Sequence, residues 1–505
     1  MLNPIAPART LVEARLAAPA SDKLVAFYDA PHLEREKRQF HQYLQVDIAH
    51  TVMLAEQGIL SPAQARSILD VLREIRELGI ARFPLDARKG SFLLQVEDYL
   101  FERIGEETGG RMHTGRSRLD QGPTVRRLFK RGELVKVLEA ILALQRVLLD
   151  VAARHATTVM PGYTCLQHAH PAVFGHYLLA FSARLSDDFD RLCGAYSRLN
   201  RNPLGGAGLS GTSWPIDRYR TTELLGFDGL VDNAKLAREA YDGAEVASAL
   251  SFTMSTLNDL ATDLHIWSSF EFAYVETADE FCGTSSIFPQ KKNPAGLEAV
   301  KFAAGGAVTW LATALATFRA EGTGDVVMRE VPLLDDAFAA TLGSLELMAA
   351  IMDSLTVNTA RMLASASGNW STATALADEV VRHCGLSFRQ AHSVVARLVR
   401  QSIDAGIPAS AVTAQMLAQA ADDLDIAGVA LSTAAIRTAL DVQGFAATRT
   451  STGGIAPGEV VRLSGAASAE LARASDWLAA CRHQIASADA MLEDALAKWT
   501  AAHAQ

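Results

Sequence analysis

A polar segment at residues 282–294, called loop 3 below, holds the side chains best suited to chemistry on an anion. Ser285 and Ser286 supply hydroxyl groups, Lys291 supplies an ammonium group and Asn293 supplies a carboxamide. A glycine near its start and two prolines oppose a regular hydrogen-bonded element, which predicts a loop between two long apolar segments. We expect this loop to hold an anionic substrate and to carry the chemistry.

Two other polar segments interrupt the apolar pattern of the chain. Loop 1, residues 111–121, is basic and includes Arg118. Loop 2, residues 160–167, contains a Pro-Gly pair and includes Thr164 and Cys165. Taken singly, a basic segment is usually a solvated face and such a threonine is usually a helix N-cap. A functional interpretation therefore depends on the motifs that the three loops form together.

Long helices are expected to position these loops. Apolar residues spaced by three, four and seven predict helices at about residues 124–155, 239–276 and 295–317. Earlier in the chain, a Ser-Pro-Ala-Gln start signal at Ser61 predicts a capped helix that ends near Gly79. Long helices with narrow apolar stripes pack as bundles, and the sequence shows no convincing period-two strands. The predicted fold class is all-α.

A chain of 505 residues is too long for one ordinary hydrophobic core. We expect an N-terminal α domain with an arm at residues 1–120, a central helical bundle at residues 121–365 and a small C-terminal α domain at residues 366–505. The last division rests on the shorter helices and the glycine and proline breaks that follow Asp353.

Composition restricts the partners and the compartment. The net charge is −10 with acidic and basic residues interspersed, which argues against nucleic acid or an anionic membrane as a partner. The five cysteines are widely spaced without a CxxC pair, which predicts reduced thiols rather than disulfides or a zinc site. No uninterrupted apolar run approaches the roughly 18 residues that span a bilayer, and the N-terminus lacks a signal-peptide core. We therefore expect a cytoplasmic protein that captures a small anionic substrate in a local positive pocket.

The three loops together resemble the signature segments of the fumarase/aspartase superfamily. Loop 3 resembles the pattern GSSxMPxKxNP, while residues 113–118 (His-Thr-Gly-Arg-Ser-Arg) and 161–164 (Pro-Gly-Tyr-Thr) look specifically like argininosuccinate lyase. Further similarity lies at residues 208–212, 373–378 and 388–392. The similarity runs in order from about residue 40 to about residue 460.

The resemblance implies a three-domain, mostly helical subunit that assembles into a homotetramer around a twenty-helix core. Each active site would combine loops 1, 2 and 3 from three different subunits. The implied reaction is a reversible β-elimination from a succinyl compound that releases fumarate, with no metal or organic cofactor.

By its place in the motif, Ser285 is implied to be the base, acting as an alkoxide. Such a serine requires positive charge and backbone amides to stabilise its anion. Lys291 and Asn293 match the positions that hold the substrate carboxylate as it becomes a dianion. Ser286 belongs to the same substrate-binding loop.

The sequence departs from the family pattern in loops 1 and 2. Arg118 and Thr164 are implied to grip carboxylate oxygens, but Leu119 stands where a substrate-binding asparagine is expected and Cys165 where a catalytic-site histidine is expected. A branched apolar side chain cannot replace the amide hydrogen bonds, and a thiol relays protons less readily than imidazole at neutral pH. Asp47 takes the place of a family serine.

A family stretch that contacts the amino-acid arm of argininosuccinate is also absent, and residues 321–330 stand in its place. The departures gather on the side expected to hold the leaving group. We therefore expect a carbon–nitrogen lyase that acts on a different N-substituted aspartate. Two alternatives stay open: a carbon–oxygen lyase or cycloisomerase on a related polycarboxylate, and a catalytically silent structural relative.

Overall fold

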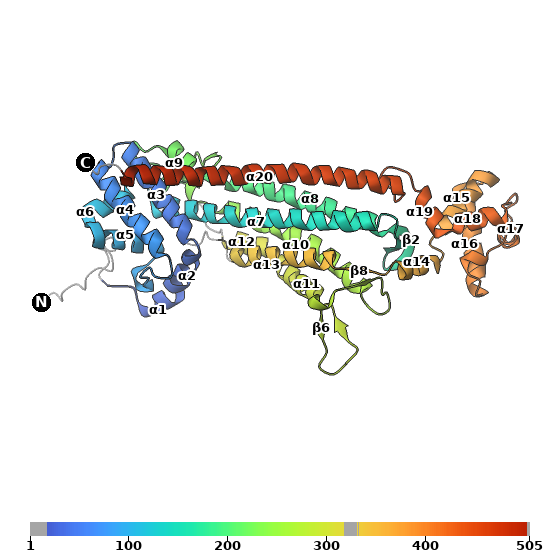
Figure 1. The fold of residues 1–505 in the computed structure, drawn as a ribbon. Helices are drawn as coiled ribbons and strands as arrows, with labels where there is room; N and C mark the ends of the chain where they lie inside the picture. Colours follow the sequence, from blue (N-terminus) through green and yellow to red (C-terminus); the bar gives the residue numbers. More distant parts are fainter. Residues whose placement is uncertain (1–17, 318–330, 332, 502–505) are drawn as a thin grey trace.

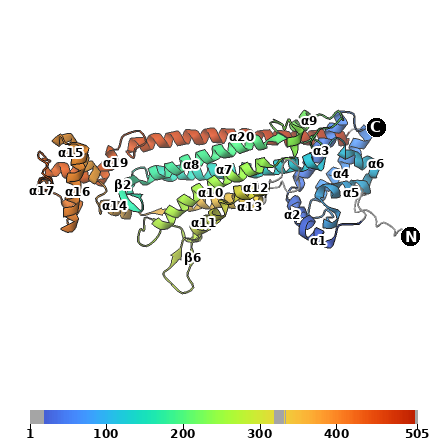
Figure 2. The same cartoon turned by 180° about the vertical axis from the view of Figure 1, so that it is seen from behind.

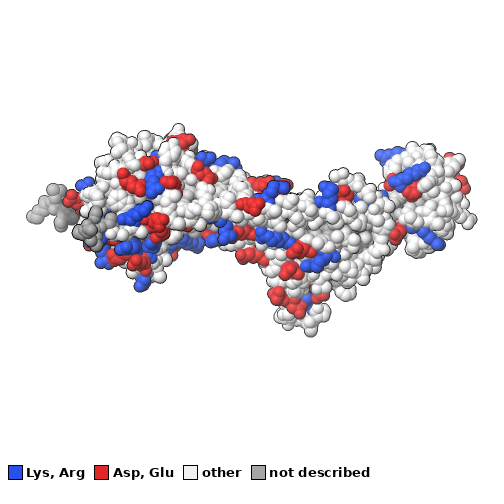
Figure 3. Space-filling view, turned by 45° about the horizontal axis from the view of Figure 1, so that its top comes forward, with Lys and Arg blue, Asp and Glu red and all other residues white. Residues whose placement is uncertain are grey.

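The computed structural model describes residues 18–317, 331 and 333–501. Figure 1 shows an elongated molecule in which long helices connect a helical cluster at the N-terminal end to a smaller cluster at the opposite end. Acidic and basic side chains are interspersed over the face shown in Figure 3. The mostly helical architecture confirms the predicted all-α class.

Six helices form the N-terminal cluster: α1 (Asp22–Leu24), α2 (Ala30–Arg38), α3 (Phe40–Glu56), α4 (Pro62–Leu78), α5 (Phe92–Ile104) and α6 (Glu106–Gly109). The predicted capping box is confirmed, because Ser61 Oγ accepts from the Gln64 backbone N–H at 3.3 Å and the Ser61 N–H donates to Gln64 Oε1 at 3.0 Å. Phe92 is fully buried at the centre of this cluster, with the rings of Tyr43 and Phe83 at 5.2 and 5.4 Å.

The central bundle consists of α7 (Arg118–Arg154), α8 (Phe174–Leu199), α10 (Tyr241–Trp267), α11 (Ala295–Ala307), α12 (Trp310–Thr317), α13 (Leu334–Asp353) and α20 (Pro457–Ala501). Helix α7 packs against α8, α13 and α20, so it forms the axis of the bundle. The short helix α9 (Arg218–Leu224) lies beside the N-terminal cluster (Figure 1).

The C-terminal cluster contains α14 (Thr359–Ser367), α15 (Ala373–Cys384), α16 (Phe388–Asp404), α17 (Ala414–Asp422), α18 (Thr433–Leu440) and α19 (Val442–Thr448). Helices α15–α18 enclose a small core of their own. The domain prediction extended this unit to residue 505, whereas the 45-residue helix α20 runs back along α7 and α8 and reaches α3 and α4. We propose that residues 457–501 belong with the bundle, because their alanine-rich pattern packs against its long helices.

Three predicted helix boundaries differ from the structure. Helix α7 begins at Arg118 rather than near residue 124, because Ser117 caps it in a capping box with Asp120. Helix α10 ends at Trp267, and the predicted helix at residues 295–317 divides into α11 and α12.

The expectation of no strands was wrong, because the described residues include short antiparallel and parallel strand pairs. The strands are β1 (Val159–Thr164), β2 (Gln167–Val173), β3 (Arg201–Asn202), β4 (Gly229–Leu230), β5 (Val275–Glu276), β6 (Gly283–Thr284), β7 (Lys292–Asn293) and β8 (Thr356–Val357). They pair as β1–β2, β3–β4, β5–β8 and β6–β7. Six of the eight are too short to show alternation, and prolines interrupt it in β1 and β2.

Helices α11 and α12 carry apolar side chains on the outside of the bundle. Phe302 is 89% exposed and Val308 is 78% exposed. By length and composition alone, Ala295–Thr317 could cross a membrane, although the polar residues Glu298 and Lys301 interrupt its apolar run. Exposed apolar side chains gathered on a bundle helix are also typical of a protein–protein contact.

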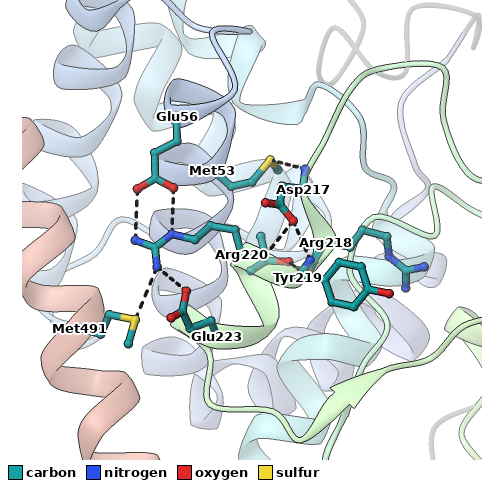
Figure 4. Close-up of polar contacts among 9 residues, drawn as sticks. Met53, Glu56, Asp217, Arg218, Tyr219, Arg220, Glu223 and Met491 are labelled. Carbon is teal, nitrogen blue, oxygen red and sulfur yellow. Dashed lines mark hydrogen bonds and ion pairs between the residues drawn. The ribbon is translucent and has the colours of Figure 1, made fainter.

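Arg220 of α9 joins three separate elements (Figure 4). Its Nε and Nη2 donate to the two carboxylate oxygens of Glu56 on α3, at 2.8 and 3.1 Å. Its Nη1 donates to Glu223 at 2.6 Å and contacts the sulfur of Met491 on α20 at 3.5 Å. The Gly-rich connector that precedes α9 is thereby tied to the N-terminal cluster and to the returning end of α20.

We expect Arg220→Ala to lower the free energy of unfolding by about 1–2 kcal/mol, because a bidentate and partly buried ion pair is lost together with the packing of the arginine stem. Arg400→Ala is the matched control, since Arg400 forms an exposed pair with Asp404 on one helix, and it should change stability by less than about 0.5 kcal/mol. Urea denaturation followed by circular dichroism measures both. Equal effects of the two substitutions would contradict this role of Arg220.

Candidate functional site

Loop 3 forms a β-hairpin that projects from the side of the bundle (Figure 1). Strands β6 and β7 pair Gly283 with Asn293, which places residues 285–291 at the tip. Ser286 and Lys291 are exposed there, while Asn293 is half-buried at the base. The structure therefore presents the predicted hydroxyl, ammonium and carboxamide groups on one short hairpin.

Ser285 sits in a tight turn at the tip of this hairpin. Its Oγ accepts hydrogen bonds from the backbone N–H groups of Ile287 at 3.2 Å and Phe288 at 3.0 Å. Two N–H dipoles aimed at one oxygen favour its negatively charged form. These two N–H groups are the backbone amides expected around Ser285 from the sequence.

The two adjacent lysines of loop 3 have different environments. Lys292 Nζ lies 2.8 Å from Glu276 Oε1 and 2.6 Å from Asp279 Oδ1, and these hydrogen bonds raise the pKa of Lys292. The Lys291 side chain is exposed, and no ion pair to it occurs among the residues that the structure describes. Lys292 thus fastens the base of the hairpin, while the Lys291 ammonium group is available to an anion.

Loop 2 forms the β1–β2 hairpin, in which Thr164 pairs with Gln167 across a two-residue turn. The turn residues Cys165 and Leu166 have φ angles of 54° and 56°. Turns with two positive φ angles normally use Asn-Gly, and left-handed backbone costs a non-glycine residue about 1 kcal/mol. The strained turn exposes Thr164, Cys165 and Leu166 together at the tip.

A chain of hydroxyl groups holds this hairpin to the bundle. Tyr163 Oη lies 2.6 Å from Tyr274 Oη, and Tyr274 Oη lies 2.7 Å from Ser365 Oγ. Burial and the hydrogen bond to Tyr274 raise the pKa of Tyr163, so Tyr163 stays protonated at neutral pH. The sequence offered no signal for these contacts, because the three residues are far apart along the chain.

The last four residues of loop 1 form the first turn of α7, with Arg118 exposed and Leu119 half-buried. Asp120 fixes this junction: its Oδ1 accepts from the Ser117 N–H at 2.7 Å, and its Oδ2 accepts from the Gly205 N–H at 2.6 Å. The start of α7 is thereby joined to the Gly-rich connector.

Arg118 and Leu119 line a cavity of about 450 Å³ beside α2 and α5. Its lining includes the acidic residues Asp29 and Glu36, the basic residues Arg118 and Arg126, and His32. Leu119 contributes to an apolar part of the wall together with two leucines of α5, Leu93 and Leu94. Sequence reasoning missed Arg126 and the α2 residues, since no motif marks them.

Asp47 was expected near this cavity but lies behind loop 1. Its side chain is fully buried and pairs with Arg116 at 2.7 Å. Asp47 therefore supports the loop instead of lining the cavity. Residues 321–330, also expected on the leaving-group side, lie outside the described residues.

Loops 1, 2 and 3 do not meet within one chain. Loop 1 runs into the start of α7 and loop 2 follows its end, so the length of this 37-residue helix holds them apart. At about 1.5 Å per residue, the separation is roughly 55 Å. Figures 1 and 2 show loop 1 and the β1–β2 hairpin at opposite ends of the bundle, with the β6–β7 hairpin at a third place.

Comparisons with known proteins match nearly the whole chain. A family model described as Lyase matches residues 23–308, and a model described as Argininosuccinate lyase C-terminal matches residues 370–447. Argininosuccinate lyase of Methanosarcina acetivorans is 36% identical over 483 residues, which cover 95% of this chain and 97% of that protein.

Among solved structures, EDDS lyase in complex with formate is similar with a TM-score of 0.86 and 34% identity, and the match covers 96% of both chains. A variant of EDDS lyase with bound fumarate has a TM-score of 0.86 and 33% identity, with 99% of both chains covered. The chain therefore belongs to the argininosuccinate lyase-like carbon–nitrogen lyases of the fumarase/aspartase superfamily.

Proposed function

We propose that this lyase releases fumarate from an N-substituted aspartate other than argininosuccinate, with Ser285 as the base. The observation that carries this proposal is the environment of Ser285, whose Oγ accepts hydrogen bonds from two backbone N–H groups on the same hairpin that exposes Lys291. Fumarate bound to a variant of EDDS lyase supports the same product for this chain.

The chemical difficulty is to remove a proton from the carbon next to a carboxylate. The electron pair left behind moves onto that carboxylate, which becomes a dianion before the carbon–nitrogen bond breaks. Ser285 takes the proton, while Lys291 and Asn293 stabilise the charge that develops on the carboxylate. Ser286, Thr164 and Arg118 hold the remaining carboxylate oxygens.

A complete site in this proposal requires several copies of the chain. Loops 1, 2 and 3 come from three subunits of a homotetramer, because α7 keeps loops 1 and 2 roughly 55 Å apart in one subunit. Exposed apolar residues at the end of α11 support a contact between bundles, since Phe302 and the C-cap residue Val308 would otherwise face water.

The cavity beside loop 1 suggests the leaving group. Its lining includes the guanidinium groups of Arg118 and Arg126. The Glu36 carboxylate also lies there, but it already accepts hydrogen bonds from Tyr43 Oη and the Phe92 N–H. Such a lining suits an amine that itself carries a carboxylate. Leu119 removes the amide that the family pattern places here, which is why argininosuccinate is disfavoured.

The second candidate is a catalytically silent relative. Two departures from the family pattern favour it: Cys165 replaces a histidine and Leu119 replaces an asparagine. A silent protein has no need of an oriented serine or of a strained, exposed turn at loop 2. A carbon–oxygen lyase or cycloisomerase is the third. Turnover of a substrate panel with product identification by NMR distinguishes all three.

We expect the wild-type protein to release fumarate from at least one member of a panel of N-substituted aspartates, followed by ultraviolet absorbance. Ser285→Ala should lower kcat by about 10³-fold or more, because no other group on loop 3 has the two N–H donors that favour an alkoxide. Ser286→Ala, the neighbouring control, should lower kcat by less than about tenfold. A Ser285→Ala variant with more than about a tenth of wild-type kcat contradicts the assignment of the base.

We expect the two lysines of loop 3 to respond differently to the same substitution. Lys291→Met should lower kcat/KM by about 10²–10³-fold, since it removes the charge that meets the carboxylate. Lys292→Met should lower it by less than about tenfold, because its partners Glu276 and Asp279 are exposed carboxylates that tolerate its loss. Steady-state kinetics on the best panel substrate measures kcat/KM for both variants. A larger loss of kcat/KM in Lys292→Met than in Lys291→Met would contradict the assigned roles.

A further inference from the structure

A fully buried ion pair lies directly beneath loop 1. Arg116 Nη1 is 2.7 Å from Asp47 Oδ1, and neither side chain is exposed to solvent. Asp47 belongs to α3, so the contact joins loop 1 to the most buried helix of the N-terminal cluster. Arg116 lies two residues before Arg118, which lines the cavity.

Two further contacts fix the same loop from below. Gln121 Nε2 donates to Asp47 Oδ1 at 2.6 Å, and Gln121 also lines the cavity. His50, one turn after Asp47 on α3, lies 2.9 Å from the Thr114 carbonyl through its Nε2. Burial and the nearby Arg116 charge hold the pKa of His50 well below its usual range, so the neutral ring donates this hydrogen bond.

Burying two charges is unfavourable unless their geometry is well fixed, and hydrophobic residues of similar volume are often equally stable. A buried ion pair is therefore better explained by the position it enforces than by the stability it adds. In this chain the ion pair holds loop 1 at Arg116. The hydrogen bonds of His50 to Thr114 and of Gln121 to Asp47 hold the two ends of the segment that contains Arg118 and Leu119.

We propose that Asp47 and Arg116 form a buried clamp that sets the position of loop 1, and through it the placement of Arg118 at the substrate cavity. Asp47 and Arg116 are positioning residues, since neither reaches the cavity itself. The link to substrate rests on the proposed function, whereas the anchoring of loop 1 does not.

The test uses two variants of the full-length protein. Asp47→Asn keeps the size of the side chain but removes the carboxylate that pairs with the buried Arg116. The double variant Asp47→Asn with Arg116→Gln removes both charges, so it should regain thermal stability relative to the single variant. Asp242→Asn is the control, because it breaks a similarly buried ion pair with Lys130 that does not touch loop 1.

Two measurements are made on each protein: amide hydrogen exchange by mass spectrometry, and the dissociation constant for fumarate by calorimetry. We expect residues 113–121 to exchange at least about tenfold faster in both clamp variants, with no change at residues 159–173 or 283–293. Fumarate should bind about tenfold more weakly to both, even though the double variant recovers stability. The control should lose stability with unchanged exchange at residues 113–121 and unchanged fumarate affinity.

Unchanged exchange at residues 113–121 in the double variant overturns the clamp. If residues 113–121 exchange faster but fumarate binds with wild-type affinity, the clamp anchors loop 1 without setting the position of Arg118 at the cavity, and that part of the proposal is overturned. If the wild-type protein does not bind fumarate, the proposed function fails instead, and the exchange data alone then decide whether the clamp anchors loop 1.

Discussion

The length and rigidity of α7 constrain the rest of this structure. The helix has 37 residues without a break, and it packs against α8, α13 and α20 along its course. It therefore acts as a spacer of roughly 55 Å between loop 1 and loop 2. Chemistry that needs both loops on one small substrate cannot occur in a single copy of the chain, which makes assembly a part of the proposed mechanism.

Because the loops lie far from one another, each is fixed by its own local contacts. In loop 3, Ser285 is oriented by backbone amides and the hairpin base is fastened by Lys292. Tyr163 and Tyr274 hold loop 2 through their hydroxyl groups. Loop 1 rests on a buried ion pair. Such local anchoring is what sites shared between subunits require, since each subunit must present its loop in a preformed shape.

The sequence predicted the features that depend on local pattern. The capped helix at Ser61, the loop character around Ser285 and the long bundle helices follow from start signals, prolines and apolar spacing. The resemblance supplied the order of the three loops, and Asp47 was identified as a departure.

What the sequence could not predict depends on contacts between distant residues. Asp47 lies beneath loop 1 because of its pairing with Arg116, and no spacing along the chain indicates this contact. The sequence did not predict that α20 is one long helix of the bundle, because its alanine-rich pattern does not indicate that it packs against α7. The turn at Cys165 contradicts ordinary turn preferences, which is typical of positions shaped by function rather than by local stability.

The central claim is that one site combines loops from different copies, and mixing two inactive variants tests it most directly. Ser285→Ala disables loop 3 and Arg118→Ala disables loop 1, so each variant alone should have little activity. When the two are unfolded, mixed and refolded together, some assemblies acquire sites with both residues intact, and fumarate release should rise at least about tenfold above either parent. A mixture no more active than its parents, while a wild-type sample treated in the same way recovers its activity, would contradict the account.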